Sequence, residues 1–272
     1  MHLNRKITVP LIKKRKNGEK ITALTAYDYP TAKIVSESGI DIILVGDSLG
    51  MVLQGYKDTM KVTIDQMIYH TDMVRRAEPH SLIVSDMPYG SYHLSVEKAT
   101  ENAIRLVKEG GAEAVKLEGG AERSDVIKSI LKAEIPVLGH LGLTPQSINK
   151  LGGFKVRGKG EKSADKIVKD AKLLEEIGVF ALVLESIPVE LGKEITDQLK
   201  IPTIGIGAGK FCDGQILVIH DLTGFTGLYL PKFVRKYADL HSVISDAVQN
   251  YIEDVKKGNF PGEKESFLIG KK

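Results

Sequence analysis

The stretch Ile42-Ile43-Leu44-Val45-Gly46-Asp47 is a short apolar run that ends at a carboxylate. Three more apolar runs end in the same way, at Asp86, at Glu118 and at Glu185. Short continuous apolar runs are typical of parallel strands that are buried on both faces. The pattern therefore predicts an α/β fold in which these four acids lie where strands leave the core.

The shared position of the four acids matters because a barrel of parallel strands brings all its C-terminal ends to one face. Acids that are distant in sequence then become neighbours, and they repel one another unless a cation lies between them. Ligands that are all oxygen favour a hard cation such as Mg²⁺. A single acid at a strand end can instead be a helix N-cap or a solvated loop residue, but four together favour one site.

The number of strands indicates which α/β fold to expect. Apolar runs begin near eight positions, namely Thr22, Asp41, Leu82, Ala114, Ile135, Phe180, Ile201 and Ile216. Eight strands with helical connections predict a (βα)₈ TIM barrel, and 272 residues fit a single domain over residues 1–272 without a second core. A doubly wound open sheet is the alternative, although it would normally gather its site at one switch point.

Three amphipathic stripes, in segments 96–107, 167–177 and 243–255, predict helices that pack on the sheet; the first includes Ile104. Two connections, Leu49 to Ser81 and Leu141 to Ala164, are longer than a helix requires. The second is basic and rich in glycine, and it contains Phe154. It is interpreted either as a lid over the barrel mouth or as a plain excursion of the chain.

Composition excludes several classes of protein. The formal net charge is only +3, which gives no overall field for nucleic acid. The basic stretch Lys13 to Lys16 is interpreted as a solvated face, with attraction to phosphate or polyglutamate as the alternative. The single cysteine, Cys212, excludes an internal disulfide and suits a reducing cytoplasm. Neither a secretory signal nor a membrane span is expected, since no uncharged apolar stretch approaches about 18 residues.

Lys116 lies two residues before Glu118 on one predicted strand, so both side chains point the same way. A lysine inside a barrel must be paired or functional. Three roles are open: a buried ion pair, a cation that binds a substrate carboxylate, and a Schiff-base lysine. Nearby acids favour the charged form and make the lysine a weaker nucleophile, which favours the carboxylate-binding role.

Other polar residues follow predicted strands. Ser48 places a hydroxyl beside Asp47. His140 ends the fifth apolar run, and it is either a packed, hydrogen-bonded residue or a catalyst. The turn from Gly205 to Gly209 follows the seventh run, where many barrels bind phosphate, but tight packing explains its glycines equally well.

Six motifs taken together resemble the ketopantoate hydroxymethyltransferase family. They are Thr25-Ala26-Tyr27-Asp28, Gly46-Asp47-Ser48-Leu49-Gly50-Met51-Val52, Tyr69-His70-Thr71, Val115-Lys116-Leu117-Glu118-Gly119-Gly120, Gly139-His140-Leu141-Gly142-Leu143-Thr144-Pro145-Gln146 and Gly205-Ile206-Gly207-Ala208-Gly209. The resemblance runs from about residue 3 to residue 260. It implies a (βα)₈ barrel of the phosphoenolpyruvate/pyruvate superfamily and a cytoplasmic homo-oligomer, typically a decamer, that acts in pantothenate and coenzyme A synthesis.

The resemblance also implies a reaction. A hydroxymethyl group passes from 5,10-methylenetetrahydrofolate to 3-methyl-2-oxobutanoate, giving 2-dehydropantoate. Two alternatives stay open: a superfamily relative that cleaves or isomerises a keto acid without folate, and a barrel that binds a metal or metabolite without catalysis.

Roles for individual residues follow from the same resemblance. It implies that Asp47, Asp86 and Glu118 form the Mg²⁺ site, with some of them acting through water. It implies that Asp47, Ser48, Asp86 and Lys116 contact the keto acid. It makes Glu185 the proton acceptor.

Overall fold

Eight parallel strands close into a barrel in sequence order, with β8 paired to β1. The computed structural model describes residues 5–153, 155–227 and 230–269. The strands are β1 Ile21–Thr25, β2 Ile42–Val45, β3 Leu82–Asp86, β4 Ala114–Glu118, β5 Val137–Gly142, β6 Ala181–Glu185, β7 Thr203–Ile206 and β8 Gly214–Leu217. The prediction of an α/β (βα)₈ TIM barrel is confirmed, and the open doubly wound sheet is excluded.

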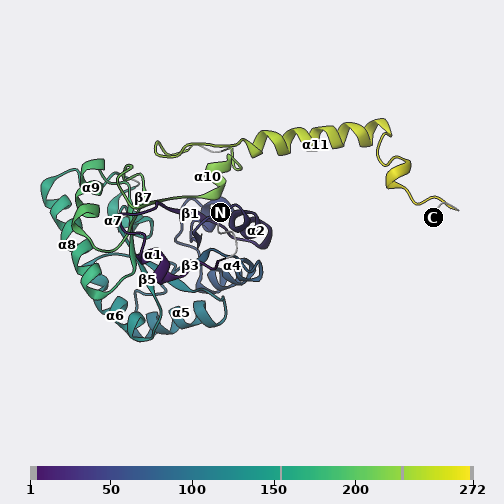
Figure 1. Ribbon diagram of the computed structural model, residues 1–272. Helices are drawn as coiled ribbons and strands as arrows, with labels where there is room; N and C mark the ends of the chain where they lie inside the picture. Colours follow the sequence, from purple (N-terminus) through teal and green to yellow (C-terminus); the bar gives the residue numbers. More distant parts are fainter. Residues whose placement is uncertain (1–4, 154, 228–229, 270–272) are drawn as a thin grey trace. The chain divides into compact units, whose positions relative to one another are not determined.

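Helices lie around the barrel in the connections from β1 to β7, whereas β7 is joined to β8 without a helix (Figure 1). They are α2 Tyr29–Glu37, α3 Leu49–Val52, α4 Ile64–Arg76, α5 Val96–Lys108, α6 Ser124–Lys132, α7 Ile148–Leu151, α8 Glu161–Ile177 and α9 Val189–Gln198. Short 3₁₀ turns cover Ala121–Arg123 and Pro145–Ser147. Local signals fix some boundaries: Thr63 and Gln66 form a capping box at the start of α4, and Gly178 ends α8 in a left-handed conformation.

The barrel interior is filled by every second residue of the strands, because strand side chains alternate between two faces. The buried interior cluster comprises Ile12, Ile21, Ala23, Ile42, Leu44, Leu82, Val84, Ala114, Leu138, Phe180, Ala181, Val183, Ile204 and Ile216. Their neighbours along the strands, such as Ile43, Val115 and Leu182, belong to the separate cluster that also contains helix residues. The part of the barrel interior that these side chains occupy is therefore a packed core and not a channel.

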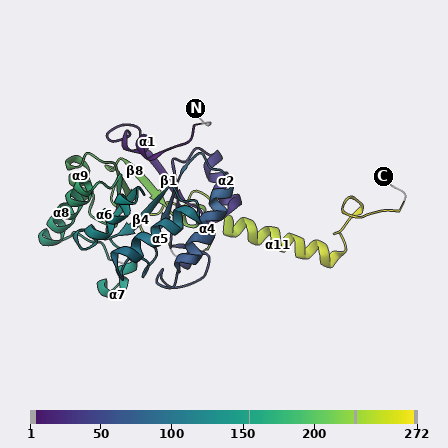
Figure 2. The ribbon, with the colours of Figure 1, turned by 90° about the horizontal axis from the view of Figure 1, so that it is seen from below.

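The N-terminal end of the barrel is closed by helix α1, Val9–Lys13, whose Ile12 is completely buried in the interior cluster. Arg15 pairs with Asp41 at 2.6 Å, and Lys16 pairs with Asp213 at 2.9 Å. The interpretation of the basic stretch as a solvated face is wrong for these two residues, because each meets a buried acid just before a strand. Figure 2 shows α1 and α7 at opposite ends of the barrel. Because α1 closes one end, a site that opens to solvent is expected at the α7 end.

Two of the three predicted helix stripes pack as expected. Ala99 and Ala103 of α5 and Ala171 and Leu174 of α8 are buried. Ile104 is the exception in α5, since it is 38% exposed. The buried face of α5 is centred on Ala99, Ala103 and Leu106, which turns Ile104 toward solvent.

The backbone divides into two compact units, residues 1–219 and 220–272, and the barrel lies within the first. The second contains helix α11, Leu240–Lys257, and a short 3₁₀ turn, Glu263–Glu265; helix α10, Ile219–Thr223, begins at the boundary. No residue of α11 is buried. That the third stripe packs on the sheet stays a prediction, because periodicity identifies an apolar face but not what covers it. That residues 1–272 form one domain stays a prediction.

None of the helices in the described ranges combines the length and the hydropathy that crossing a bilayer requires.

Candidate active site

Strand side chains alternate between two faces, and the inward-facing rows that fill the barrel interior end in polar residues at its C-terminal mouth. Asp86 continues the inward row of Leu82 and Val84 on β3. Lys116 and Glu118 continue the row of Ala114 on β4, His140 follows Leu138 on β5, and Glu185 follows Val183 on β6. Strand register sets Asp86 opposite Lys116 and Glu118 opposite His140. The structure therefore brings these predicted site residues together at the C-terminal mouth of the barrel.

Lys116 and Asp86 form a buried ion pair, with 2.6 Å between Nζ and Oδ1 and side-chain exposures of 6% and 3%. Burial by itself lowers the pKa of Lys116, but Asp86, Glu118 and Asp47 outweigh it and raise that pKa above its ordinary value. The ammonium group is therefore held in its charged form. Of the three roles considered for Lys116, the ion pair is observed.

Asp47 lies beyond the end of β2, and its backbone N–H donates to Asp86 Oδ2 at 3.1 Å. Burial and the neighbouring carboxyl groups of Asp86 and Glu118 raise the pKa of Asp47 well above its usual range. Gly46 permits this close approach, because a Cβ there would lie 2.7 Å from Ser48 Oγ and 3.5 Å from Asp86 Oδ2.

His140 lies between two acids. Its Nε2 is 3.2 Å from Glu185 Oε2, without the alignment of a hydrogen bond, and its Nδ1 is 3.5 Å from Glu118 Oε1. Burial and Lys116 lower the pKa of His140, but Glu118 and Glu185 outweigh them and raise it to about 9. The imidazole is thus a second cation at the mouth. Glu185 keeps a side-chain exposure of 16%, which leaves it accessible from the opening.

Ser48 is fixed by a residue that sequence reasoning did not assign to the site. Its Oγ lies 2.8 Å from the hydroxyl of Tyr27, which is completely buried. The backbone carbonyl of Tyr27 in turn lies 2.7 Å from His70 Nδ1. The Ser48 hydroxyl therefore has a defined position beside Asp47.

Gln146 and Tyr92 are two further residues that the sequence prediction missed as site residues. Gln146 Nε2 donates to Asp47 Oδ2 at 2.8 Å, and the Tyr92 hydroxyl donates to Gln146 Oε1 at 2.6 Å. Gln146 belongs to one of the six motifs that carried the resemblance. A glutamine, however, is not a residue type that marks a site at the end of a strand. Tyr92 lies in the connection after β3, where no pattern marks it.

The acids at the mouth suit a hard cation, although they do not form a closed cage. Among the residues that the structure describes, no three side chains of His, Cys, Asp or Glu are arranged to hold one metal ion directly. Asp47, Asp86 and Glu118 are nevertheless close enough for the last two to raise the pKa of the first. Mg²⁺ commonly uses one or two carboxylates and keeps several waters, so this donor set fits it.

The long connection after β5 contacts the rest of the barrel near its own C-terminal end, just before α8. The backbone N–H of Arg157 donates to the carbonyl of Ser186 at 2.9 Å, and Gly158 has no room for a Cβ beside Leu191. Phe154 lies outside the described residues, and the role of the segment as a lid stays a prediction. In the turn after β7, a Cβ on Gly209 would lie 2.2 Å from Val189, so packing accounts for this glycine.

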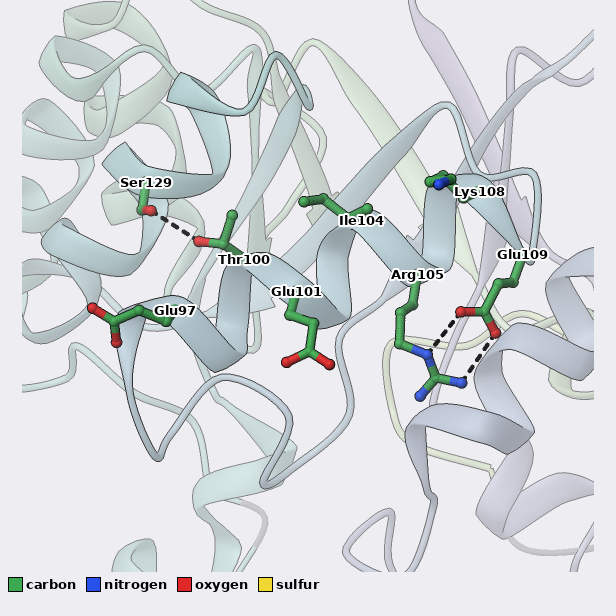
Figure 3. Close-up of a pocket in the computed structure, with 8 residues that line it drawn as sticks. All are labelled: Glu97, Thr100, Glu101, Ile104, Arg105, Lys108, Glu109 and Ser129. Atoms are coloured by element: carbon green, nitrogen blue, oxygen red, sulfur yellow. Dashed lines mark hydrogen bonds and ion pairs between the residues drawn. The ribbon is translucent and has the colours of Figure 1, made fainter.

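A groove of about 580 Å³ lies elsewhere, on the outer surface along α5 (Figure 3). The hydroxyl groups of Thr100 and Ser129 lie 2.8 Å apart there, and Arg105 pairs with Glu109 at 2.8 Å. These polar groups satisfy one another, and none belongs to the cluster at the barrel mouth. The groove is therefore separate from the cluster at the barrel mouth.

A closed parallel barrel with acidic and basic side chains gathered at its C-terminal mouth defines the class of TIM-barrel enzymes. The chain belongs to the ketopantoate hydroxymethyltransferase family, whose model matches residues 6–263. It is thus a transferase enzyme, as the sequence resemblance predicted.

Relatives of high identity carry one name. A 3-methyl-2-oxobutanoate hydroxymethyltransferase from Thermoanaerobacter sp. (strain X514) is 57% identical over 265 residues, covering 97% of each chain. The protein of the same name from Geobacter metallireducens is 55% identical over 266 residues, covering 97% of this chain and 100% of the relative.

Solved structures with low identity share the fold. A 2,3-dimethylmalate lyase, described as a member of the PEP mutase/isocitrate lyase superfamily, matches with a TM-score of 0.61 and 14% identity, covering 96% of this chain and 89% of the other. A phosphonopyruvate hydrolase matches with a TM-score of 0.62 and 11% identity, covering 95% and 93%.

Proposed function

We propose that this enzyme transfers a hydroxymethyl group from 5,10-methylenetetrahydrofolate to C3 of 3-methyl-2-oxobutanoate. The products are 2-dehydropantoate and tetrahydrofolate, one water is consumed, and the step belongs to pantothenate synthesis. The observation that carries this proposal is the 55–57% identity to relatives named for the reaction, over nearly the whole chain. The charged cluster at the barrel mouth supports it with suitable chemistry.

Mg²⁺ is proposed as the cofactor, held by Asp47, Asp86 and Glu118, in part through water. When bound, the ion supplies positive charge next to the keto group, which acidifies the neighbouring C–H bond. The buried Oδ1 of Asp86 supports this assignment, since among the described residues it has no hydrogen-bond donor beyond its ion pair with Lys116.

Lys116 is proposed to bind the carboxylate of the keto acid, together with contacts from Asp47, Ser48 and Asp86. A lysine whose pKa is raised stays protonated and lacks the free electron pair that a Schiff base requires. The ion pair with Asp86 holds the ammonium group at the level of the mouth. These contacts bind and orient the substrate without a covalent bond to the protein.

Glu185 is proposed as the base that removes the proton from C3. It lies on β6, apart from the three acids on the β2, β3 and β4 side, so it can approach the carbon while the others hold the oxygens. A positioned base typically supplies about 10²- to 10⁴-fold in rate. The His140 imidazole lies 3.2 Å from the Glu185 carboxylate and limits the directions in which it can point. C3 then forms a bond to the methylene carbon of the donor; one C–N bond of that carbon breaks as the donor opens to its iminium form, and water replaces the second nitrogen, which gives the hydroxymethyl group and releases tetrahydrofolate.

A turnover assay distinguishes this function from its rivals. Purified protein with Mg²⁺ and 3-methyl-2-oxobutanoate should form 2-dehydropantoate only when methylenetetrahydrofolate is added, and tetrahydrofolate should appear in equal amount. Cleavage of a keto acid without folate would indicate the lyase or mutase alternative. Binding without turnover would indicate a non-catalytic barrel. The decameric assembly and the cytoplasmic location stay predictions.

A further inference from the structure

Gln146 is a buried amide at the centre of the acidic cluster, and the proposed reaction gives it no role. Its exposure is 4%. Its Nε2 donates two hydrogen bonds, to Asp47 Oδ2 at 2.8 Å and to the carbonyl of Met87 at 2.9 Å. Its backbone N–H donates to Glu118 Oε2 at 3.1 Å. One residue therefore contacts two of the three acids proposed to bind Mg²⁺.

Tyr92 fixes the orientation of this amide. The Tyr92 side chain is 1% exposed, and its hydroxyl donates to Gln146 Oε1 at 2.6 Å. The same hydroxyl oxygen accepts from the backbone N–H of Glu118 at 3.3 Å. A flipped amide would place Oε1 against the Asp47 carboxyl and the Met87 carbonyl, which are both acceptors. Only one orientation of the Gln146 amide is compatible with its three partners, Asp47, Met87 and Tyr92.

We propose that Gln146 and Tyr92 are positioning residues that hold Asp47 and Glu118 in the orientation that binds the divalent cation. The Gln146 amide donates to Oδ2 of Asp47, whereas Oδ1 of Asp47 accepts no hydrogen bond within the described part of the chain. That oxygen is left for the cation. Partners of this kind set ligand orientation, and their loss typically costs about 10- to 100-fold in metal affinity or activity. The inference rests on the proposed metal site.

The test measures Mn²⁺ binding to the full-length protein without substrate, by the electron paramagnetic resonance signal of free Mn²⁺. Gln146→Met keeps the length of the side chain but removes the amide donor. It should raise the Mn²⁺ dissociation constant by about 10-fold or more. Gln198→Met is the matched control, because Gln198 is exposed on α9 and its Nε2 donates to Glu194 in the same helix. The control should leave Mn²⁺ binding unchanged.

A double-mutant cycle separates positioning from a general structural role. Asp47→Asn should weaken Mn²⁺ binding, and the variant with both Asp47→Asn and Gln146→Met should bind no more weakly than Asp47→Asn alone. Additive losses would overturn the inference, as would unchanged affinity in Gln146→Met. If Asp47→Asn binds Mn²⁺ normally, the inference fails together with the metal site. Hydroxymethyl transfer by the wild type, measured separately, still reports on the proposed function.

Tyr92→Phe provides a second variant that conserves the packing of the ring. It removes the donor to Gln146 and the acceptor for Glu118, so Mn²⁺ affinity should fall several-fold, and the buried groups left without a partner should lower the melting temperature by several degrees without unfolding the protein. If Gln146→Met does not fold, this variant decides the question. Wild-type affinity in folded Tyr92→Phe would then contradict the proposal.

Discussion

Lys116 and Asp86 stand opposite each other on adjacent strands, with their charged atoms 2.6 Å apart in the barrel interior. The pair gives the mouth a fixed cation next to the carboxyl groups of Asp47 and Glu118. It also explains why a lysine can be buried at this depth, since an unpaired ammonium group would be costly there. The same charge is available to a substrate carboxylate.

Lys116→Ala should raise the KM for 3-methyl-2-oxobutanoate by about 10- to 100-fold, because it removes a hydrogen bond to a charged group. Steady-state kinetics measure this, with Lys108→Ala on the exposed face of α5 as the control. Borohydride added with the keto acid should leave the mass of the wild-type protein unchanged. A trapped adduct at Lys116 would show that the lysine is a covalent catalyst.

Removal of the divalent cation should abolish turnover. Treatment with EDTA followed by gel filtration should give inactive protein, and added Mg²⁺ should restore the activity. Asp86→Asn should need more Mg²⁺ for half-maximal rate, because it removes a charged oxygen from a site for a hard ion. Full activity in protein shown by elemental analysis to be metal-free would refute the metal assignment.

His140 should titrate far above an ordinary histidine in the metal-free protein. Contacts with Glu118 and Glu185 raise its pKa from 6.5 in the unfolded chain to about 9 in the folded one. The charged form is therefore favoured by folding, so its stabilisation is complete below pH 6.5 and is lost as the pH rises through 9. The contribution is roughly 3 kcal/mol.

Two measurements check this prediction. Histidine ring resonances in NMR spectra of EDTA-treated protein should include one with a midpoint near pH 9 that is missing in His140→Gln. Urea unfolding should show that the stability difference between wild type and His140→Gln shrinks between pH 6 and pH 10. A difference that stays constant over this range would mean that His140 is neutral when folded.

Lys16 should stabilise the N-terminal end of the barrel although it lies in a stretch that resembles a solvated basic face. Its ion pair with Asp213 is nearly buried, with side-chain exposures of 10% and 4%. Lys16→Met should lower the free energy of unfolding by about 2 to 3 kcal/mol, whereas Lys13→Met, at an exposed position, should change it by less than about 0.5 kcal/mol. Equal effects of the two substitutions in urea unfolding would contradict this.

The barrel could be predicted from the sequence because each strand carries a local signal in its own residues. Runs of β-branched residues are buried on both faces, and the predicted starts at Leu82 and Ala114 coincide with the observed ones. The acids at the ends of those strands were found for the same reason. The neighbours of each helix face were harder to predict, since Ile104 belongs to an apolar stripe yet faces solvent.

The residues that support the acids could not be predicted because their roles depend on contacts across the barrel mouth. Tyr92 and Gln146 come from the connections after β3 and β5, and only the closed barrel brings them together. A buried amide or phenol has no characteristic spacing in a sequence. The ion pair of Lys16 with Asp213 could not be predicted from the sequence either, because the two residues are 197 positions apart.

The barrel mouth is proposed to remove a proton from C3 of 3-methyl-2-oxobutanoate, with Glu185 as the base. Wild-type protein with Mg²⁺ in D₂O, without folate, should exchange that proton for deuterium, as followed by proton NMR. Glu185→Gln should bind the keto acid nearly as well as the wild type, measured by calorimetry, but exchange the proton slower by about 10²-fold or more. Exchange at the wild-type rate in Glu185→Gln would contradict the account and place the base elsewhere, with His140 next to test.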